Sequence, residues 1–216
     1  MEPTKHTIPK CIPTDNPKTI SLIKLIRYTK KERMKIEQTP LKNCFIIHDT
    51  VHGDERGYFI ETFNQRDFQN ASGLDIVFVQ DNQSKSSKGV LRGLHMQRGD
   101  AAQAKLVRVL EGAVLDIAVD LRKDSPTFGQ HFAIELTGEN HKQFFVPSGF
   151  AHGFVVLSET ATFFYKVDKF YEPGNEVGIM YNDKDLKIDW RLAESEIILS
   201  EKDKTLGSFA EYAASL

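Results

Sequence analysis

The residues best suited to proton-transfer chemistry lie between positions 92 and 108. This stretch of seventeen residues holds one histidine, His95, and four cations, among them Arg92, Lys105 and Arg108. Histidine gives and takes protons near neutral pH more readily than other side chains, and lysine and arginine suit an anionic substrate or a developing oxyanion. The pattern predicts a proton-transfer site for a small molecule that carries a phosphate or a carbonyl group.

A second histidine and a tyrosine are further candidates. His152 follows the turn sequence Pro-Ser-Gly (147–149) and precedes an apolar segment, so the turn could aim the ring inward or leave it to hydrogen-bond a loop carbonyl. Tyr165, in Phe-Phe-Tyr-Lys (163–166), could be a core aromatic or a general acid. His95 alone would suit a buried structural role, but the neighbouring cations favour a site, because cations are almost never buried without a partner.

Two polar segments could contact a ligand. Residues 81–89 (DNQSKSSKG) are expected to form a polar loop, which is either a solvated turn or a source of hydrogen bonds for a sugar or nucleotide. Residues 54–57 (DERG) predict a turn in which Arg56 could contact a phosphate.

Metal binding is not expected. A β-barrel metal site would need a His-x-His pair with a carboxylate a few residues on, whereas His95 is followed by methionine and glutamine. His95 and His152 alone supply too few ligands. The two cysteines, Cys11 and Cys44, are too few for a disulfide framework and have no spacing typical of zinc.

Length and composition exclude several classes of protein. The chain has 216 residues, of which 40% are hydrophobic and 10% aromatic, enough for one large domain with a sizeable core. The net charge of −2 argues against electrostatic binding of nucleic acid. Apolar runs are all shorter than the about 20 residues of a membrane span, and we expect a cytoplasmic protein.

Residues 1–40 differ from the rest of the chain. They carry nine Lys/Arg against four Asp/Glu, a net charge of +5, whereas the remaining residues carry −7. Residues 1–18 contain four prolines, and the isoleucines and leucines of 20–26 fit a short amphipathic helix. A membrane-surface or partner-binding helix is one interpretation. We favour another interpretation, in which residues 1–40 are a basic extension, poorly ordered or a short helix, or are translated sequence upstream of a true start at Met34. One domain at 41–216 follows.

From residue 41 onward the pattern is β. Short runs rich in valine, isoleucine and phenylalanine alternate with turn signals, and their close spacing favours an antiparallel sandwich or barrel. The expected strands include residues 44–47, 57–63, 76–80, 114–121, 132–136, 143–146, 153–157 and 162–167. Only residues 64–73, 192–195 and the last dozen look helical. The mouth of such a barrel can hold a ligand.

Residues 44–203 closely resemble the dTDP-4-dehydrorhamnose 3,5-epimerases of the cupin superfamily. The resemblance covers about three quarters of the chain, in family order and with similar spacing. It is carried by GDERGYFIETFNQRDF (53–68), FVQDNQSKSSKGVLRGLHMQ (78–97), KLVRV (105–109), DSPTFGQ (124–130), VPSGFAHGF (146–154), FFYK (163–166) and LSEKD (199–203). It implies a mainly β, cupin-type jelly-roll of antiparallel strands with a few short helices.

The resemblance also implies a reaction. Such enzymes invert C3 and C5 of dTDP-4-dehydro-6-deoxy-D-glucose on the route to dTDP-L-rhamnose, and they need no redox cofactor and no metal. In this sequence His95 matches the general base, and Asp203 matches the aspartate that orients it. Lys105 matches the lysine that stabilises the enolate, and Tyr165 matches the general acid on the opposite face of the sugar.

Further residues match substrate contacts of the family, some to the sugar and some to the diphosphate or nucleoside. They are Arg56, Glu61, Gln80, Asp81, Asn82, Arg92, His152, Glu176 and Lys202. The resemblance implies a homodimer in which the partner subunit supplies part of the nucleotide site.

Two alternatives remain at this stage. The first is a relative that epimerises one carbon only or acts on another nucleotide-linked 4-keto sugar, although Tyr165 favours inversion at both carbons. The second is a non-catalytic cupin that binds a sugar nucleotide. It would be expected if His95, Lys105 or Tyr165 had been replaced, and all three are present.

Overall fold

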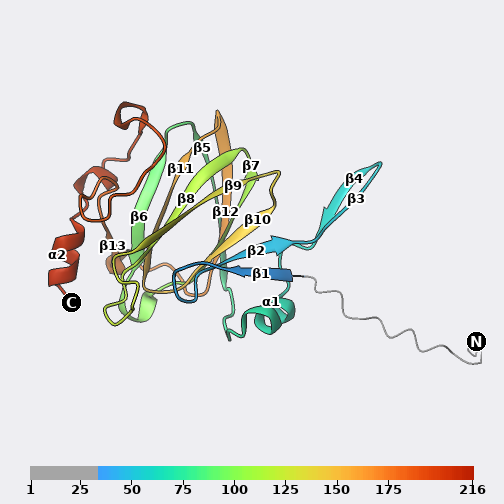
Figure 1. The fold of residues 1–216 in the computed structure, drawn as a ribbon, viewed down its shortest axis with the longest axis horizontal. Coiled ribbons are helices and arrows are strands. Elements are labelled where there is room, and N and C mark those ends of the chain that lie inside the picture. The colour runs from blue at the N-terminus through green and yellow to red at the C-terminus, as the bar shows by residue number, and fades with distance from the viewer. Residues whose placement is uncertain (1–33) are drawn as a thin grey trace, which may run out of the picture. The chain divides into compact units, whose positions relative to one another are not determined.

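The computed structural model describes residues 34–216, which form two antiparallel sheets packed face to face (Figure 1). The larger sheet has six strands, in spatial order β1 (Met34–Gln38), β2 (Phe45–Asp49), β10 (Lys142–Val146), β7 (Lys105–Glu111), β12 (Thr160–Val167) and β5 (Gln80–Ser87). The smaller sheet has five strands, β13 (Glu176–Gly178), β6 (Leu91–Gln97), β11 (Phe150–Val156), β8 (Ala113–Asp120) and β9 (His131–Thr137). The expected mainly β, antiparallel jelly-roll is confirmed.

The period-two side-chain pattern of the strands produces the layers. In β8, Val114 and Ala118 face the core between the sheets, whereas Leu115, Ile117 and Val119 face the opposite side. Successive side chains of a strand point to opposite faces, and here both faces are covered. This is why the segment reads as a nearly continuous apolar run.

Each outer face has its own cover. The C-terminal segment packs on the smaller sheet through residues such as Leu186 and Trp190. This segment ends in the helix α2 (Phe209–Ala214) and includes the short 3₁₀ turns η3 (Glu194–Glu196) and η4 (Asp203–Thr205). The helix α1 (Gln65–Ser72) covers the larger sheet, and its fully buried Phe68 packs with Phe45 and Phe145.

The ends of α1 follow from its sequence. The Asn64 side chain accepts a hydrogen bond from the backbone N–H of Asp67 at the N-terminus, and Gly73 takes the left-handed conformation at the C-terminus. The helices expected at residues 64–73 and at the C-terminus are therefore confirmed, whereas the one expected at 192–195 is only the 3₁₀ turn η3. Two further 3₁₀ turns, η1 (Gly99–Ala101) and η2 (Pro173–Asn175), lie in connections.

Two expectations were wrong in this part of the chain. Residues 81–87 are not a loop but most of strand β5, which pairs with β12 along its whole length. Their polar composition is typical of a loop, but here it has another cause: one face of β5 is exposed to solvent and the other lines a polar cavity. The strand expected at 76–80 is not formed, because residues 76–79 are irregular and β5 begins only at Gln80. Ile76 and Phe78 of this irregular segment pack beside α1.

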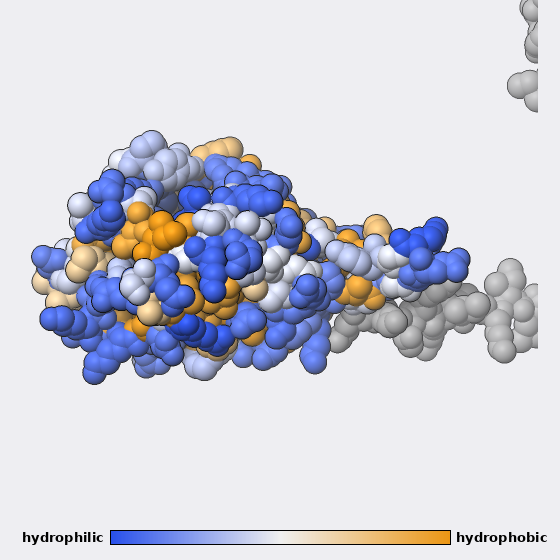
Figure 2. Space-filling view, turned by 90° about the horizontal axis from the view of Figure 1, so that it is seen from above, coloured by the Kyte–Doolittle hydropathy of each residue, from blue (hydrophilic) through white to orange (hydrophobic). Residues whose placement is uncertain are grey.

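A short hairpin, β3 (Val51–Asp54) and β4 (Gly57–Ile60), projects away from the two sheets (Figures 1 and 2). It carries exposed apolar side chains, of which Phe59 is 69% and Tyr58 61% accessible. Arg56 lies at its turn, as the sequence predicts, and its guanidinium is paired with Asp54.

The domain boundary expected at residue 40 can be compared with the position of strand β1. Strand β1 pairs with β2 in register from Met34 to Gln38, so these residues belong to the larger sheet. The expectations for residues 1–33 lie outside the described residues. Within residues 34–216, no helix is long and apolar enough to cross a membrane.

Candidate active site

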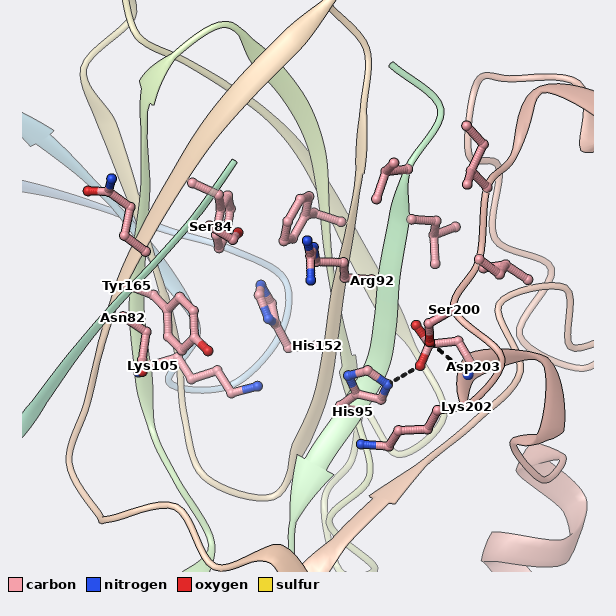
Figure 3. Close-up of a pocket in the computed structure, with 17 residues that line it drawn as sticks. Asn82, Ser84, Arg92, His95, Lys105, His152, Tyr165, Ser200, Lys202 and Asp203 are labelled. Carbon is pink, nitrogen blue, oxygen red and sulfur yellow. Dashed lines mark hydrogen bonds and ion pairs between the residues drawn. The ribbon is translucent and has the colours of Figure 1, made fainter. Parts of the chain in front are cut away.

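A cavity of about 590 Å³ opens between the two sheets, and its polar lining comes from both sheets and from the C-terminal segment (Figure 3). Its volume is in the range that holds a small molecule. The polar lining residues are Asn82, Gln83, Ser84, Arg92, His95, Lys105, His152, Tyr165, Ser200, Lys202 and Asp203. The apolar lining residues are Val90, Leu91, Phe154, Phe163, Ile198 and Leu199.

Strand register explains how distant residues meet here. His95 on β6 and His152 on β11 are direct partners across the smaller sheet. Lys105 on β7 and Tyr165 on β12 come from the larger sheet, where Tyr165 pairs with Val107 and so lies on the same face as Lys105. The two histidines therefore face a lysine and a tyrosine across the cavity (Figure 3).

His95 is held by a buried carboxylate. Its Nε2 lies 2.6 Å from Oδ1 of Asp203, whose side chain is 4% exposed. The backbone N–H of Asp203 donates to the Ser200 hydroxyl, which holds the carboxylate in place. Burial lowers the pKa of His95 below its ordinary value, and the charge of Asp203 opposes this effect. The ring is consequently neutral and oriented at neutral pH, as a general base must be.

Lys105 and Tyr165 have pKa values shifted by the same burial. Loss of solvent lowers the pKa of Lys105 to about 8, although the charges of Asp116 and Glu176 act in the opposite direction. Burial raises the pKa of Tyr165, and the nearby Arg92 partly offsets this. At neutral pH the cavity therefore holds an ammonium group and a protonated phenol.

Glu176 links several groups at the edge of the cavity. It forms an ion pair with Lys202 and accepts a hydrogen bond from Tyr171 at 2.8 Å. Its carboxylate also lies 4.0 Å from Nδ1 of His95. Burial would raise the pKa of Glu176, but Lys202 and Tyr171 hold it below its usual value, so this group is a carboxylate.

The other expected contact residues divide into two groups. Asn82, Arg92, His152 and Lys202 line the cavity, and the Gln80 amide donates to the Asn82 side chain at 2.9 Å. Asp81, Arg56 and Glu61 do not line it. Asp81 alternates to the outer face of β5 and pairs with Lys166 at 2.8 Å. Arg56 and Glu61 lie in and beside the projecting hairpin.

Sequence reasoning missed four polar residues of the site. Gln83, Ser84 and Ser200 line the cavity, and Asp116 of β8 lies behind His152. The available signal for Asp116 was an acid inside the apolar run 114–121, since charged residues are seldom buried without a partner. Among the described residues no cluster of three His, Cys, Asp or Glu side chains is arranged to hold a metal ion.

Comparison with known proteins agrees with this architecture. The sequence profile of the dTDP-4-dehydrorhamnose 3,5-epimerase family matches residues 38–211. The enzyme of that name from Pseudomonas aeruginosa is 50% identical over 178 residues, which cover 82% of this chain and 97% of the relative.

Solved structures extend the similarity to the fold. The crystal structure of the 3,5-epimerase from Elizabethkingia anophelis is 57% identical, with a TM-score of 0.81 over 83% of this chain and 98% of that one. The Legionella pneumophila 3,5-epimerase, solved with dTDP-4-keto-L-rhamnose, is 48% identical, with a TM-score of 0.79 over 83% of this chain and 96% of that one. With the profile spanning most of its length and relatives at half identity or more, the chain belongs to the dTDP-4-dehydrorhamnose 3,5-epimerase family of isomerases.

Proposed function

We propose that this protein inverts C3 and C5 of dTDP-4-dehydro-6-deoxy-D-glucose and so forms dTDP-4-dehydro-L-rhamnose. The observation that carries the proposal is the His95–Asp203 pair facing Lys105 and Tyr165 across one cavity. The names of the relatives support the same activity.

The substrate itself makes the chemistry accessible. C3 and C5 both flank the C4 carbonyl, so loss of a proton from either carbon gives an enolate whose charge lies largely on the C4 oxygen. Return of a proton to the opposite face inverts the carbon. Each inversion needs a base on one side, an acid on the other and a cation at the oxygen.

His95 is the base in this proposal. Its neutral ring accepts the proton from carbon, and the buried Asp203 then stabilises the imidazolium that forms. The aspartate also holds the ring in one orientation and one tautomer, because a carboxylate can only accept the Nε2 proton. Nδ1 is thereby assigned as the nitrogen that abstracts the substrate proton.

Lys105 stabilises the enolate oxygen. Its ammonium group lies in a cavity with little solvent, where a charge acts more strongly than in water. The negative charge on the C4 oxygen is fully developed only after deprotonation, so this contact favours the transition state over the ground state.

Tyr165 returns the proton from the other side. It projects from the larger sheet, whereas His95 belongs to the smaller sheet, so the two groups approach a bound sugar from opposite walls (Figure 3). Its raised pKa keeps the phenol protonated until it transfers the proton to the carbanion.

The remaining contacts suit a sugar nucleotide and a dimer. Arg92, Lys202 and Asn82 offer donors to the diphosphate and sugar within the cavity. Arg56 and Glu61 lie away from the cavity, and the hairpin that carries Arg56 exposes Val51, Tyr58 and Phe59. We therefore extend the proposal to a homodimer in which this hairpin crosses to the partner's cavity and brings Arg56 to the nucleotide.

The activity is tested by incubating dTDP-4-keto-6-deoxyglucose with the protein in deuterated water and following the sugar by NMR. Deuterium at both C3 and C5 supports the double epimerase. Deuterium at only one carbon would contradict the double epimerase and indicate a single-site epimerase. Saturable binding without exchange would favour a non-catalytic sugar-nucleotide-binding protein.

The exchanged hairpin is tested by complementation. Arg56→Ala and His95→Ala subunits are each expected to be impaired, but a co-expressed mixed dimer regains one cavity with both residues. Random pairing of equal amounts then restores about a quarter of the parent rate, since half the dimers are mixed and each has one complete cavity. No recovery in dimers shown to be mixed would contradict a crossing Arg56.

A further inference from the structure

Beside the cavity the chain crosses from the larger sheet to the smaller one. Residues 168–175 connect the end of β12, on the larger sheet, to the start of β13, on the smaller sheet. This crossing segment carries Tyr171 and ends immediately before Glu176, the first residue of β13. Contacts that fix the crossing segment therefore also fix the position of Glu176.

Gln97 of β6 holds the middle of the crossing segment. It is 4% exposed, and its Oε1 accepts a hydrogen bond from the backbone N–H of Glu172 at 3.0 Å. Gln97 pairs directly with Glu176 in the sheet and lies two residues beyond His95, so the three side chains share one face of the sheet. At its β12 end the crossing segment is held by separate hydrogen bonds.

Stability gives no reason for a glutamine at position 97. Nε2 of Gln97 is buried and has no hydrogen-bond partner within residues 34–216. A buried donor without a partner lowers stability, and an apolar side chain of the same shape would avoid this cost. Glu172 is an exposed residue, so water can replace Gln97 at its N–H. The amide is therefore better explained by the segment that it positions.

Glu176 is the chemical group that this contact places. Its carboxylate lies 4.0 Å from Nδ1 of His95, forms an ion pair with Lys202 and accepts the hydroxyl proton of Tyr171. Lys202 and Tyr171 keep it ionised, because both hold its pKa down against the effect of burial. A fixed negative charge thus stands beside the proposed base.

This charge acts on all three groups of the proposed chemistry. Burial has the largest effect on each pKa: it lowers those of His95 and Lys105 and raises that of Tyr165. Glu176 raises all three, since a negative charge favours a protonated neighbour. It therefore helps to keep Lys105 charged at neutral pH despite the burial of that side chain.

We infer that Gln97 is a positioning residue: by binding the backbone of Glu172 it fixes the crossing segment and holds the Glu176 carboxylate beside His95. The inference rests on the proposed function, because it assigns Gln97 a part in turnover by His95. Gln97 is not among the residues that line the cavity, so in this assignment it acts only through Glu176.

An NMR titration of the histidine rings tests the inference without using activity. The charged groups that act on His95 are Asp203, Glu176 and Lys105. Gln97→Met has a similar volume but no strong acceptor, so Glu176 should move away from the ring and the pKa of His95 should fall. Glu176→Gln should also lower it, and adding Gln97→Met to that variant should lower it no further. An unchanged His95 pKa in Gln97→Met would overturn the inference.

The pH profile of kcat/KM provides a second readout. His95 sets its acidic limb and Lys105 its alkaline limb in the proposed chemistry. Both limbs should move to lower pH in Gln97→Met, because both pKa values lose part of the upward effect of Glu176. At neutral pH kcat/KM should fall by up to about 100-fold, the cost of misplacing a group by about 1 Å. A loss of rate with both limbs in place would reduce Gln97 to a structural group.

Gln143→Met is the matched control. Gln143 is 2% exposed, and its Nε2 donates to Asp49 and to the Thr62 carbonyl, both at 2.6 Å, on the face of the larger sheet opposite the cavity. This control should lose stability, because two acceptors lose their donor, and should leave the His95 pKa in place. Gln97→Met should do the reverse, with the melting temperature of the parent and a lower His95 pKa. An equal fall of the His95 pKa in both variants would overturn the inference.

The titration also separates this inference from the proposed function. If the exchange experiment finds no epimerase but the His95 pKa responds as described, the proposed function fails and Gln97 still positions Glu176. If the exchange experiment establishes the epimerase but the His95 pKa in Gln97→Met equals that of the parent, the function stands and the role of Gln97 is refuted.

Discussion

The pH dependence of turnover provides the sharpest test of the proposed chemistry. Burial lowers the pKa of Lys105 to about 8, although an exposed lysine titrates near 10.5. Only the protonated amine stabilises an enolate, so the rate should fall as pH rises through this value. One pH unit above the pKa, about a tenth of the molecules retain the charge, and two units above it about a hundredth.

The acidic side of the profile belongs to His95. Its pKa lies below the ordinary 6.5, and only its neutral form accepts a proton, so the rate should fall as pH drops through that lower value. The expected profile of kcat/KM, which reports the ionising groups of the free enzyme, is a bell with its plateau around neutral pH. The assay is the initial rate of deuterium incorporation at C3 and C5 across the range from about pH 5 to about pH 10.

Substitution at Lys105 identifies the alkaline limb. Arginine stays charged above pH 12, so in Lys105→Arg the fall near pH 8 should disappear and the next limb should come from Tyr165, whose pKa is raised above 10. Lys105→Met, which cannot carry charge, should be slower by about 10²- to 10³-fold and lack this limb altogether.

Two outcomes would refute this reasoning. If the parent protein shows no fall until pH approaches 10, burial does not depress the lysine pKa as the structure indicates. If an active Lys105→Arg variant keeps the fall near pH 8, another group produces it.

Other predictions concern single residues. Asp203→Asn should lower kcat about 100-fold or more while the circular dichroism spectrum stays unchanged, because His95 loses its orienting charge. Turnover at the parent rate would show that His95 does not need Asp203 to act as the base. Tyr165→Phe should slow product formation more than it weakens substrate binding, as measured by kcat against Kd, whereas a loss of affinity alone would make Tyr165 a contact. Gly93→Ala should lower the free energy of unfolding by at least about 1–3 kcal/mol, since a Cβ there would lie 2.5 Å from the Gly153 Cα. Gly57→Ala is its control, because φ is similarly positive (+124° against +128°) but nothing lies within 4 Å; equal losses in the two variants would show that backbone strain, not the close strand contact, sets the cost.

Part of this fold could be predicted from local patterns alone. Alternating apolar residues and turn signals identify most strands of both sheets, and the Asn64 cap and Gly73 delimit α1. The segment 81–87 could not be assigned in this way. Its polarity is typical of a loop, and only the partner strand and the cavity show why a strand can be polar on both faces.

The sequence by itself determined which chemical groups are available: the histidines, the lysine and the tyrosine on strands, and their resemblance to an epimerase family. Only the tertiary structure decided how they combine. Asp203 reaches His95 across 108 positions of sequence, and Asp116 meets His152 across 36. Such contacts depend on strand register and on which face each side chain occupies, and a shift of one residue would reverse both. For the same reason the structure, not the motif, separates Arg56 and Asp81 from the cavity that their neighbours in sequence help to build.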